Sequence, residues 1–274
     1  MDFKPSKVWQ TTSRALAEVM DRTYKAHKDA EPKRKYLGGS MIGRDCEREI
    51  AYQYHDTPME PRGDGIVGFS GQLYRIFDRG HKGEDRMAEY LRIAGFDLVT
   101  HRKDGSQFGW SVLDGRMRGH IDGVILSGPP MPQIAGVDYG KPGLWENKIL
   151  NNATFNKLWN NGLKKTKPVY YAQVNLYMAY MELDWCLFTA ENADSCEVYC
   201  EVLPLDTQCA QEMSDRGVRI VRSERPEDLP RVAGDATDFR CKFCDYQKLC
   251  WDRSSIENVN HQAAPAWLTK PTDT

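Results

Sequence analysis

Four short segments rich in β-branched and aromatic residues follow a long helical pattern, and this order constrains the fold more than any other feature of the sequence. The helical pattern runs from Leu73 to Ala94, where apolar residues recur at helical spacing until Gly95 ends it. Glycine, aspartate or proline separates the four segments, as is typical of short strands. The predicted strands are Phe96–Thr100, Phe108–Leu113, Gly119–Leu126 and Leu144–Leu150.

The second half of the chain continues this alternation. A Pro/Gly-rich insert, Ser127–Gly143, predicts a long hairpin loop. Beyond the fourth strand, the pattern predicts two helices with two strands between them. These helices are Pro168–Leu183 and Leu205–Ser223, and the strands are Trp185–Thr189 and Val198–Leu203. The whole order predicts an α/β protein with a mixed sheet.

The beginning of the chain predicts two more helices, separated by Gly38-Gly39-Ser40. The first covers Thr12–Lys28, and the second covers Met41–Tyr54 and carries Cys46. Pro58–Gly71 is rich in glycine and proline and predicts a loop. The sequence thus divides into an N-terminal helical segment (1–72), a core (73–225) and a Cys-rich C-terminal segment with a tail (226–274).

Composition limits the classes of protein that this chain fits. Its 274 residues are 41% hydrophobic and 28% charged, an ordinary globular balance. No window approaches the roughly 18 apolar residues that cross a bilayer, and the N-terminus lacks the apolar run of a secretory signal. We therefore expect a cytoplasmic protein, from a bacterium or a phage-infected cell, with no membrane partner. The net charge of −2 gives no general attraction for nucleic acid, so any DNA contact must rest on local clusters.

Two segments on predicted strands carry acidic and basic residues at a chemically useful spacing. They are Gly119-His120-Ile121-Asp122-Gly123 and Trp145-Glu146-Asn147-Lys148. Alternate residues of a strand face the same way, so Glu146 and Lys148 share a face that Asp122 can join from a neighbouring strand. Two carboxylates can hold a hard divalent cation, which makes hydroxide available near neutral pH, and a lysine can orient that water. Taken alone, the same spacing also fits an exposed strand with a surface ion pair.

Two predicted helices add polar residues at helical spacing. His81 and Glu84 are three residues apart and share a helical face, so His81 fits either a metal ligand or a surface residue. Gln173 and Tyr177 are four apart, in a stripe that fits either a tyrosine-rimmed core helix or a helix that faces the reacting phosphate.

In order and approximate spacing, these residues resemble the RecB-type branch of the PD-(D/E)XK nucleases. The resemblance rests on His81, Asp122, Glu146-Asn147-Lys148 and Gln173-xxx-Tyr177. It implies a restriction-endonuclease-like core, in which helices flank a mixed central sheet, with N- and C-terminal helical segments joined by a four-Cys metal cluster. Ile121 departs from the family pattern, because it stands where the name-giving proline would be.

The resemblance also implies roles for these residues. His81, Asp122 and Glu146 would bind Mg²⁺ or Mn²⁺ together with the backbone carbonyl of Asn147. Lys148 would assist the attacking water. Two further residues of the catalytic set would support the site and the DNA, namely Gln173 and Tyr177.

Four lysines between the active-site strand and the Gln/Tyr helix predict a lysine-rich loop. They are Lys157, Lys164, Lys165 and Lys167. The last three are candidate DNA-phosphate contacts. A solvated surface is the alternative interpretation of such a run.

Eight cysteines are distributed unevenly along the chain. Cys241, Cys244 and Cys250 crowd the C-terminal segment, and Cys46 is a candidate fourth ligand for zinc or an iron–sulfur cluster. The set resembles that of AddB-type nucleases and CRISPR-associated iron–sulfur exonucleases, which implies a 4Fe–4S cluster; a structural Zn²⁺ remains the alternative. The remaining cysteines are expected to be buried thiols: Cys186, Cys196, Cys200 and Cys209.

Together these features predict a metal-dependent DNA exonuclease that acts on single strands or duplex ends, in recombination, repair or phage DNA processing. The chain has no phosphate-binding loop of the GxxxxGK[ST] type, which argues against a helicase–nuclease. Two alternatives stay open. One is an endonuclease that trims DNA ends for CRISPR spacer acquisition, and the other is a non-cleaving DNA-binding or assembly module.

Overall fold

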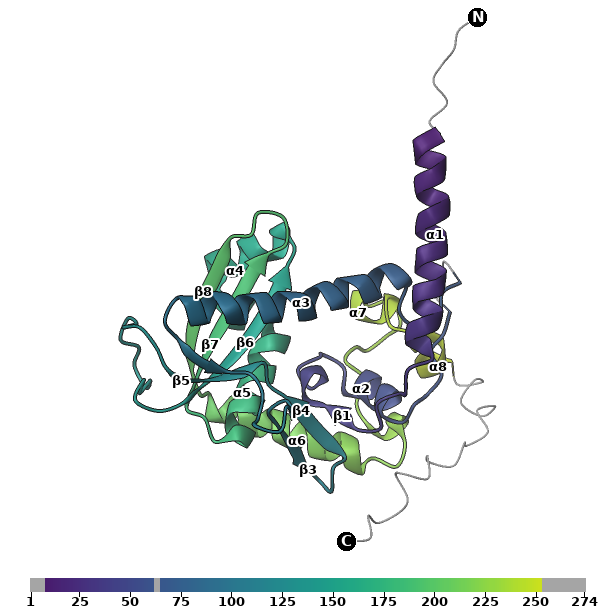
Figure 1. Cartoon of the computed structure of the whole chain (residues 1–274). Helices are drawn as coiled ribbons and strands as arrows, with labels where there is room; N and C mark the ends of the chain where they lie inside the picture. The colour runs from purple at the N-terminus through teal and green to yellow at the C-terminus, as the bar shows by residue number, and fades with distance from the viewer. Residues whose placement is uncertain (1–7, 62–64, 253–274) are drawn as a thin grey trace, which may run out of the picture.

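Helices flank two β-sheets in the computed structural model, which describes residues 8–61 and 65–252 (Figure 1). The helices are α1 (Val8–Asp29), η1 (Gly39–Met41), α2 (Glu47–Tyr54), α3 (Gly71–Ile93), α4 (Asn152–Thr166), α5 (Pro168–Met181), α6 (Thr207–Arg222), η2 (Pro226–Asp228), α7 (Phe239–Lys242) and α8 (Gln247–Trp251). The strands are β1 (Leu37–Gly38), β2 (Asp97–Val99), β3 (Gly109–Val112), β4 (Met117–His120), β5 (Gly123–Ser127), β6 (Gly143–Leu150), β7 (Trp185–Asn192) and β8 (Val198–Pro204).

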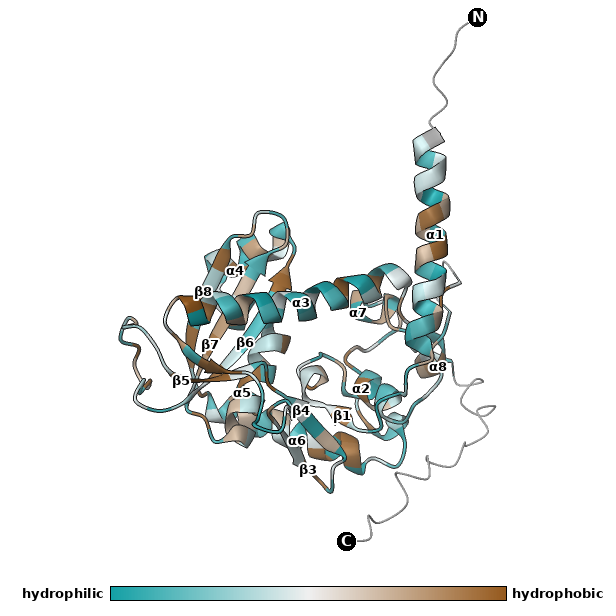
Figure 2. Cartoon of the chain, viewed as in Figure 1, coloured by the Kyte–Doolittle hydropathy of each residue, from teal (hydrophilic) through white to brown (hydrophobic). Residues whose placement is uncertain are grey.

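The larger sheet has five strands in the order β2-β5-β6-β7-β8. Only β6 and β7 run parallel, and the other neighbours are antiparallel, so the sheet is mixed. Every residue of β7 is buried, which explains the apolar run of its first half, Trp185–Phe188. Figure 2 shows hydrophobic residues concentrated on β5 and on parts of β7, whereas α3 is largely hydrophilic. The prediction of an α/β protein with a mixed sheet is confirmed.

The smaller sheet, in the order β1-β4-β3, corrects one predicted strand. Gly119–Leu126 was expected to be continuous, but the chain leaves β4 at Ile121-Asp122 and starts β5 in the larger sheet. Ile121 is fully buried, and its N–H donates to the Phe108 carbonyl 3.0 Å away, so it anchors the crossing point in the core. Asp122 therefore lies in a break between two sheets rather than within a strand.

Of two predicted segments near the N-terminus, the helix is corrected and the loop is confirmed for its described residues. The helix expected over Met41–Tyr54 begins only at Glu47, because Gly39–Met41 forms a short 3-10 turn, and Cys46 is the residue at the start of α2. The expected loop of residues 58–71 contains no helix or strand before α3 among its described residues, and residues 62–64 lie outside the described part of the chain.

The lysine-rich segment is a helix, α4, and the prediction of a loop there was wrong. The Asn151 side chain caps its first turn by accepting from the Thr154 N–H at 2.9 Å. Gly162, with φ of 73°, kinks the helix near its end, and Lys167 separates it from α5. Asparagines and the glycine concealed this helix in the sequence, since both residue types are unfavourable in helix interiors.

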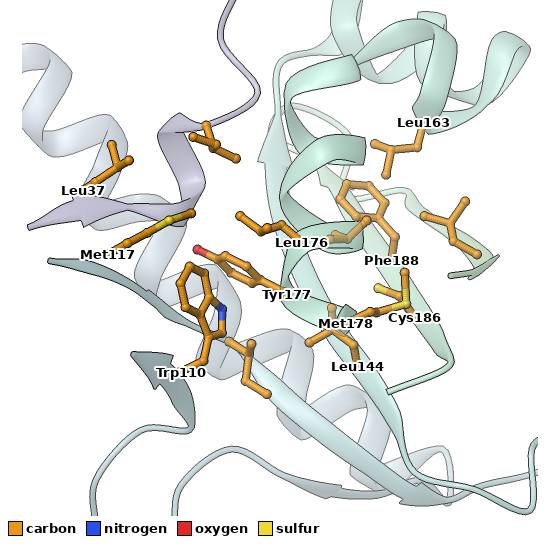
Figure 3. Close-up of a cluster of buried hydrophobic side chains, with 14 of the residues drawn as sticks. Leu37, Trp110, Met117, Leu144, Leu163, Leu176, Tyr177, Met178, Cys186 and Phe188 are labelled. Atoms are coloured by element: carbon orange, nitrogen blue, oxygen red, sulfur yellow. The ribbon is translucent and has the colours of Figure 1, made fainter. Parts of the chain in front are cut away.

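Helix α5 joins the two sheets through its buried side chains. In Figure 3, Trp110 and Met117 from the smaller sheet lie at the ring end of Tyr177, with Leu37 beyond Met117, while Phe188 from β7 lies farther along the cluster. The predicted elements α3, α5, β7, β8 and α6 are confirmed within a few residues of their expected ends. The β5–β6 connection is the predicted long hairpin loop.

Helix α1 extends away from the rest of the chain and packs against α3 (Figure 1). None of the helices in the described part of the chain combines the length and the apolar character that a membrane crossing requires.

Two of the four cysteines expected to be buried are not. Cys186 is buried in β7, and Cys209 is half-buried. Cys196 and Cys200 are exposed, because the first lies in the turn between β7 and β8 and the second lies on the edge strand β8.

Candidate active site

The structure brings together the three residues expected at the catalytic centre. Glu146 and Lys148 lie two residues apart on β6, with Lys148 Nζ 2.5 Å from Glu146 Oε1. Asp122 approaches from the break between β4 and β5, and its Oδ2 accepts from the Asn147 N–H at 2.8 Å. Glu146 is only 1% exposed, so this is not the surface ion pair that the spacing alone also allowed.

Helix α5 places both of its predicted site residues against this group. Gln173 Nε2 donates to Glu146 Oε1 at 2.5 Å, which fixes the carboxylate from the side opposite its own strand. Tyr177 is buried, and burial followed by the charge of Glu146 raises the pKa of its hydroxyl well above the usual range. Its ring packs edge-on against Trp110, with the centroids 5.8 Å apart.

Helix α3 contributes His81 and a third carboxylate, Glu84. His81 Nδ1 lies 3.5 Å from Glu84 Oε2, as expected from their spacing, and the imidazole is largely exposed. Burial, then the charge of Asp122, raises the pKa of Glu84. The sequence did not assign Glu84 to the site, although its position one turn after His81 was the available signal.

These groups line one cavity of about 700 Å³. The N-terminal segment, α3, β4, β6 and α5 all contribute to its walls. Its charged and polar lining includes Arg34, Tyr36, His81, Glu84, Asp85, Glu89, Arg92, His101, Arg118, His120, Asp122, Glu146, Lys148, Gln173 and Tyr177. The basic residues Arg34 and Arg118 were not predicted as site residues.

The site holds more acidic than basic side chains. Burial raises the pKa of Asp122, and burial followed by the charge of Asp122 raises the pKa of Glu146 to about 8. Burial alone would lower the pKa of Lys148, but the charges of Glu146 and Asp122 raise it overall, so Lys148 stays an ammonium ion. One ammonium does not balance three ionised carboxylates, including Glu84, so a further cation would favour their ionised form.

The donor set fits a hard divalent metal ion. Glu146 Oε2 is buried and has no hydrogen-bond partner in the described part of the chain, and carboxylate and carbonyl oxygens are what Mg²⁺ and Mn²⁺ prefer. Among the described residues, however, no three His, Cys, Asp or Glu side chains already converge as metal ligands. Lys148 Nζ donates hydrogen bonds to Glu146 Oε1 and, at 2.9 Å, to the Asn147 carbonyl oxygen. Both oxygens are among the atoms expected to bind the metal. A bound cation would therefore take over contacts that the ammonium makes here.

Without metal, the free energy of unfolding is expected to fall as pH rises from about 4.5 to about 8. The folded protein keeps a proton on Glu146 in this window, while the unfolded chain has released it, and stability falls wherever the folded state binds more protons. Urea denaturation in EDTA at several pH values measures this slope. Glu146→Gln should flatten it, and stability that rises with pH in both proteins would contradict the assignment.

The four cysteines of the predicted cluster come from both ends of the chain into one region. Cys46 begins α2, Cys241 and Cys244 flank the end of α7, and Cys250 lies in α8. Burial raises the pKa of the Cys241 and Cys244 thiols, Cys244 to about 12, and the charges of Cys46 and Cys250 add to both shifts. The four thiols, all among the described residues, do not converge closely enough here to hold a metal ion together.

Of the three candidate DNA-contacting lysines, Lys167 lies nearest the site. Its Nζ is 5.8 Å from the centre of the Tyr170 ring, which also lies 5.6 Å from the Nζ of Lys148. Lys164 pairs with Asp206 at 3.0 Å on the other side of the α4–α5 junction. Lys165 is exposed on α4.

Comparisons with known proteins give distant likenesses only. No protein-family model and no curated protein matches the chain. Among solved structures, it is similar to an alkaline exonuclease (LHK-Exo) from Laribacter hongkongensis, with 18% identity over 68% of this chain and 86% of that one and a TM-score of 0.46. The same enzyme in complex with dAMP gives a TM-score of 0.45 at 18% identity, with the same coverage of both chains. SSO0001 gives 0.41 at 13% identity, over 86% of this chain and 96% of that one. At such values, the function has to be argued from the site itself.

Proposed function

We propose that this chain is a divalent-metal-dependent deoxyribonuclease of the PD-(D/E)XK superfamily, with its chemistry centred on Glu146. One observation carries the proposal. Glu146 is buried, one oxygen is fixed by Lys148 and Gln173, and the other has no partner among the described residues. An unpaired carboxylate oxygen is costly to bury, and a metal-dependent site gives it a purpose.

Asp122, Glu146 and the Asn147 carbonyl would hold Mg²⁺ or Mn²⁺, with His81 as a further ligand in keeping with the family resemblance. Glu84, beside His81, adds a carboxylate on the same wall. When bound, the ion polarises the phosphodiester and lowers the pKa of a water molecule.

The chain's own side chains supply orientation and charge. Lys148 carries a permanent positive charge on the cavity wall, where it can donate to the attacking water or to the phosphate oxygens as charge develops. Gln173 holds Glu146 in place, and Tyr177 backs the same helix face against Trp110. Water attacks phosphorus, one P–O bond breaks, and the leaving oxygen takes up a proton.

DNA ends or single strands are the proposed substrate, and exonucleolytic release the proposed mode. Recombination, repair or phage DNA processing would require such an activity. A trimming endonuclease has the same chemistry at the metal and differs only in where the strand enters. A non-cleaving DNA-binding module is disfavoured, because binding alone does not require three buried or half-buried carboxylates that destabilise one another.

A 4Fe–4S cluster on Cys46, Cys241, Cys244 and Cys250 is proposed as a structural tie between the two ends of the chain. These thiols are close enough for the charges of Cys46 and Cys250 to raise the pKa values of Cys241 and Cys244, which supports the proposal. A structural Zn²⁺ bound by the same cysteines remains the alternative.

Lys164, Lys165 and Lys167 are proposed as outer DNA-phosphate contacts.

The proposal predicts metal-dependent release of label from end-labelled single- or double-stranded DNA. Lys148→Met should lower the rate by at least about a hundredfold, because the ammonium that offsets developing charge is lost. Lys141→Ala is the matched control, since it removes the same charge from an exposed pair with Asp184. EDTA should abolish cleavage by every variant, and the order of label release gives the polarity. A folded, metal-loaded protein that binds DNA without cutting it would favour the binding module.

A further inference from the structure

One part of the cavity wall is basic, although the catalytic part is acidic. Arg34 and Arg118 both lie against the Tyr36 ring, with guanidinium carbons 5.3 and 5.2 Å from its centroid. All three side chains line the same cavity as Asp122 and Glu146. The positive group is therefore part of the candidate active site and not a remote surface patch.

The smaller sheet presents these side chains to the cavity. Leu37 and Met117 are fully buried partners across β1 and β4, and both lie within the core in Figure 3. The next pair in register is Gly38 and Arg118, and strand alternation turns Arg118 outward.

Gly38 gives the second guanidinium its space. A Cβ placed on Gly38 would overlap the Arg34 guanidinium. A Cβ at this position would displace the end of the Arg34 side chain, so the glycine allows the observed arrangement of both guanidinium groups against the Tyr36 ring.

No carboxylate in the described part of the chain neutralises Arg34 or Arg118. Within residues 8–61 and 65–252, the Arg118 side chain donates to the Gly115 carbonyl, at 2.8 Å, and to no carboxylate. Arg92, on the same cavity wall, is instead satisfied by the Leu98 carbonyl and the Thr100 hydroxyl. Two like charges held against one ring repel each other, and an anion between them would relieve that repulsion.

We propose that Arg34 and Arg118 bind a second phosphate of the nucleic acid, distinct from the phosphate that is cleaved. This inference rests on the proposed nuclease function and adds a substrate-positioning subsite to it. Guanidinium groups match phosphate oxygens in pairs. Because two guanidinium groups already cover Tyr36, its ring is a support for the arginines and not a platform for a base. The ligand is a phosphodiester one or more nucleotides from the cleaved bond, or a terminal phosphate monoester.

Binding without turnover tests the subsite. Fluorescence anisotropy with a labelled oligothymidylate, in EDTA, should show a Kd about tenfold higher for Arg118→Ala or Arg34→Ala than for the wild type. The salt dependence, log K against log [salt], should lose about 0.7 of its slope with each arginine. Lys33→Ala is the matched control, because it removes an adjacent exposed charge that pairs with Asp56, and it should change Kd less than about twofold.

Gly38→Ala tests the position of the Arg34 guanidinium without removing a charge. It should weaken binding, but less than Arg34→Ala does, because the added Cβ displaces only the end of a flexible side chain. Equal Kd values for the wild type and both arginine variants would overturn the proposal. So would an equal loss of affinity in Lys33→Ala, since that result indicates general charge attraction only.

Two further experiments distinguish the possible ligands and separate a failure of the subsite proposal from a failure of the proposed nuclease function. Oligonucleotides with and without a 5′- or 3′-phosphate distinguish a terminal monoester from an internal diester. If the subsite binds a terminal monoester, the increase in Kd caused by Arg118→Ala depends on whether that end phosphate is present. If it binds an internal diester, the increase is the same for all the oligonucleotides. Hydrolysis of bis(p-nitrophenyl) phosphate, which has no second phosphate, should fall less in Arg118→Ala than kcat/KM on DNA does, and Lys33→Ala should leave both rates unchanged. If the wild type hydrolyses neither substrate, the nuclease proposal fails, and the anisotropy result alone decides whether the subsite exists.

Discussion

Replacing Glu146 with Gln is expected to lower kcat for DNA cleavage by at least about a thousandfold, with the protein still folded. The change keeps the size of the side chain but removes the charge to which a divalent cation would bind. It also turns the partnerless Oε2 position into a neutral group and leaves Lys148 without its closest carboxylate contact. Both effects act on the reacting phosphate, so we expect kcat to fall more than affinity for DNA.

Glu191→Gln is the matched control for this substitution. Glu191 lies on the adjacent strand β7, is similarly buried, and also has one oxygen without a partner among the described residues. Its other oxygen pairs with Arg86 at 2.5 Å, and it does not line the cavity. Single-turnover cleavage in Mg²⁺ or Mn²⁺ should therefore be close to wild type in Glu191→Gln. Equal activity of the two variants would refute the placing of Glu146 at the catalytic centre.

If the proposed 4Fe–4S cluster is bound, Cys250→Ser is expected to lower the melting temperature by about 10 °C and to abolish iron binding. A metal cluster on Cys250 would bind α2 to the C-terminal helices, and removing one ligand loses that tie along with its folding free energy. The region otherwise rests on a small cluster, in which Tyr52 and Tyr246 stack with centroids 4.9 Å apart beside Cys250.

Cys200→Ser, at an exposed thiol on β8, is the control for this change and should leave the melting temperature unaltered. Iron, sulfide and zinc analysis of the purified protein, together with its visible absorption, identifies the metal. Zinc without iron would indicate a structural Zn²⁺ in place of the 4Fe–4S cluster. A metal-free wild-type protein with the same melting temperature as Cys250→Ser would contradict any cluster at these four residues.

The placement of Glu146 and Lys148 together on β6 was predictable because it follows directly from strand geometry. Glu146 and Lys148 are two apart, and only alternation is needed to place them on one face. Gln173 was predictable as part of a stripe, since a helical spacing is also local. Contacts between elements were not predictable: no local pattern shows that Asp122 accepts from the Asn147 N–H or that Gln173 donates to Glu146.

Where the prediction failed, tertiary contacts overrode local patterns. The alternation over Gly119–Leu126 continues through Ile121, so the change of sheet at that residue leaves no sign in the sequence. Helix α4 is rich in asparagine and is kinked at Gly162, and both residue types have a low helix propensity. The packing of Phe155 and Leu158 into the core outweighs that low propensity. Arg34 and Arg118 are 84 residues apart, and only the parallel pairing of β1 with β4 brings them to one ring.

Asp122 also completes the hydrogen bonding of the sheet. Pairing of β5 with β6 covers Gly143 to Trp145, and just beyond it the Asp122 carboxylate accepts from the Asn147 N–H, which the pairing with β5 does not reach. Asp122→Ala would thus remove a proposed cation ligand and also leave the Asn147 N–H without this acceptor. Asparagine keeps an acceptor for that amide and removes only the charge. A comparison of the two variants would therefore separate the proposed role of this carboxylate in binding a cation from its structural role as the acceptor of the Asn147 N–H.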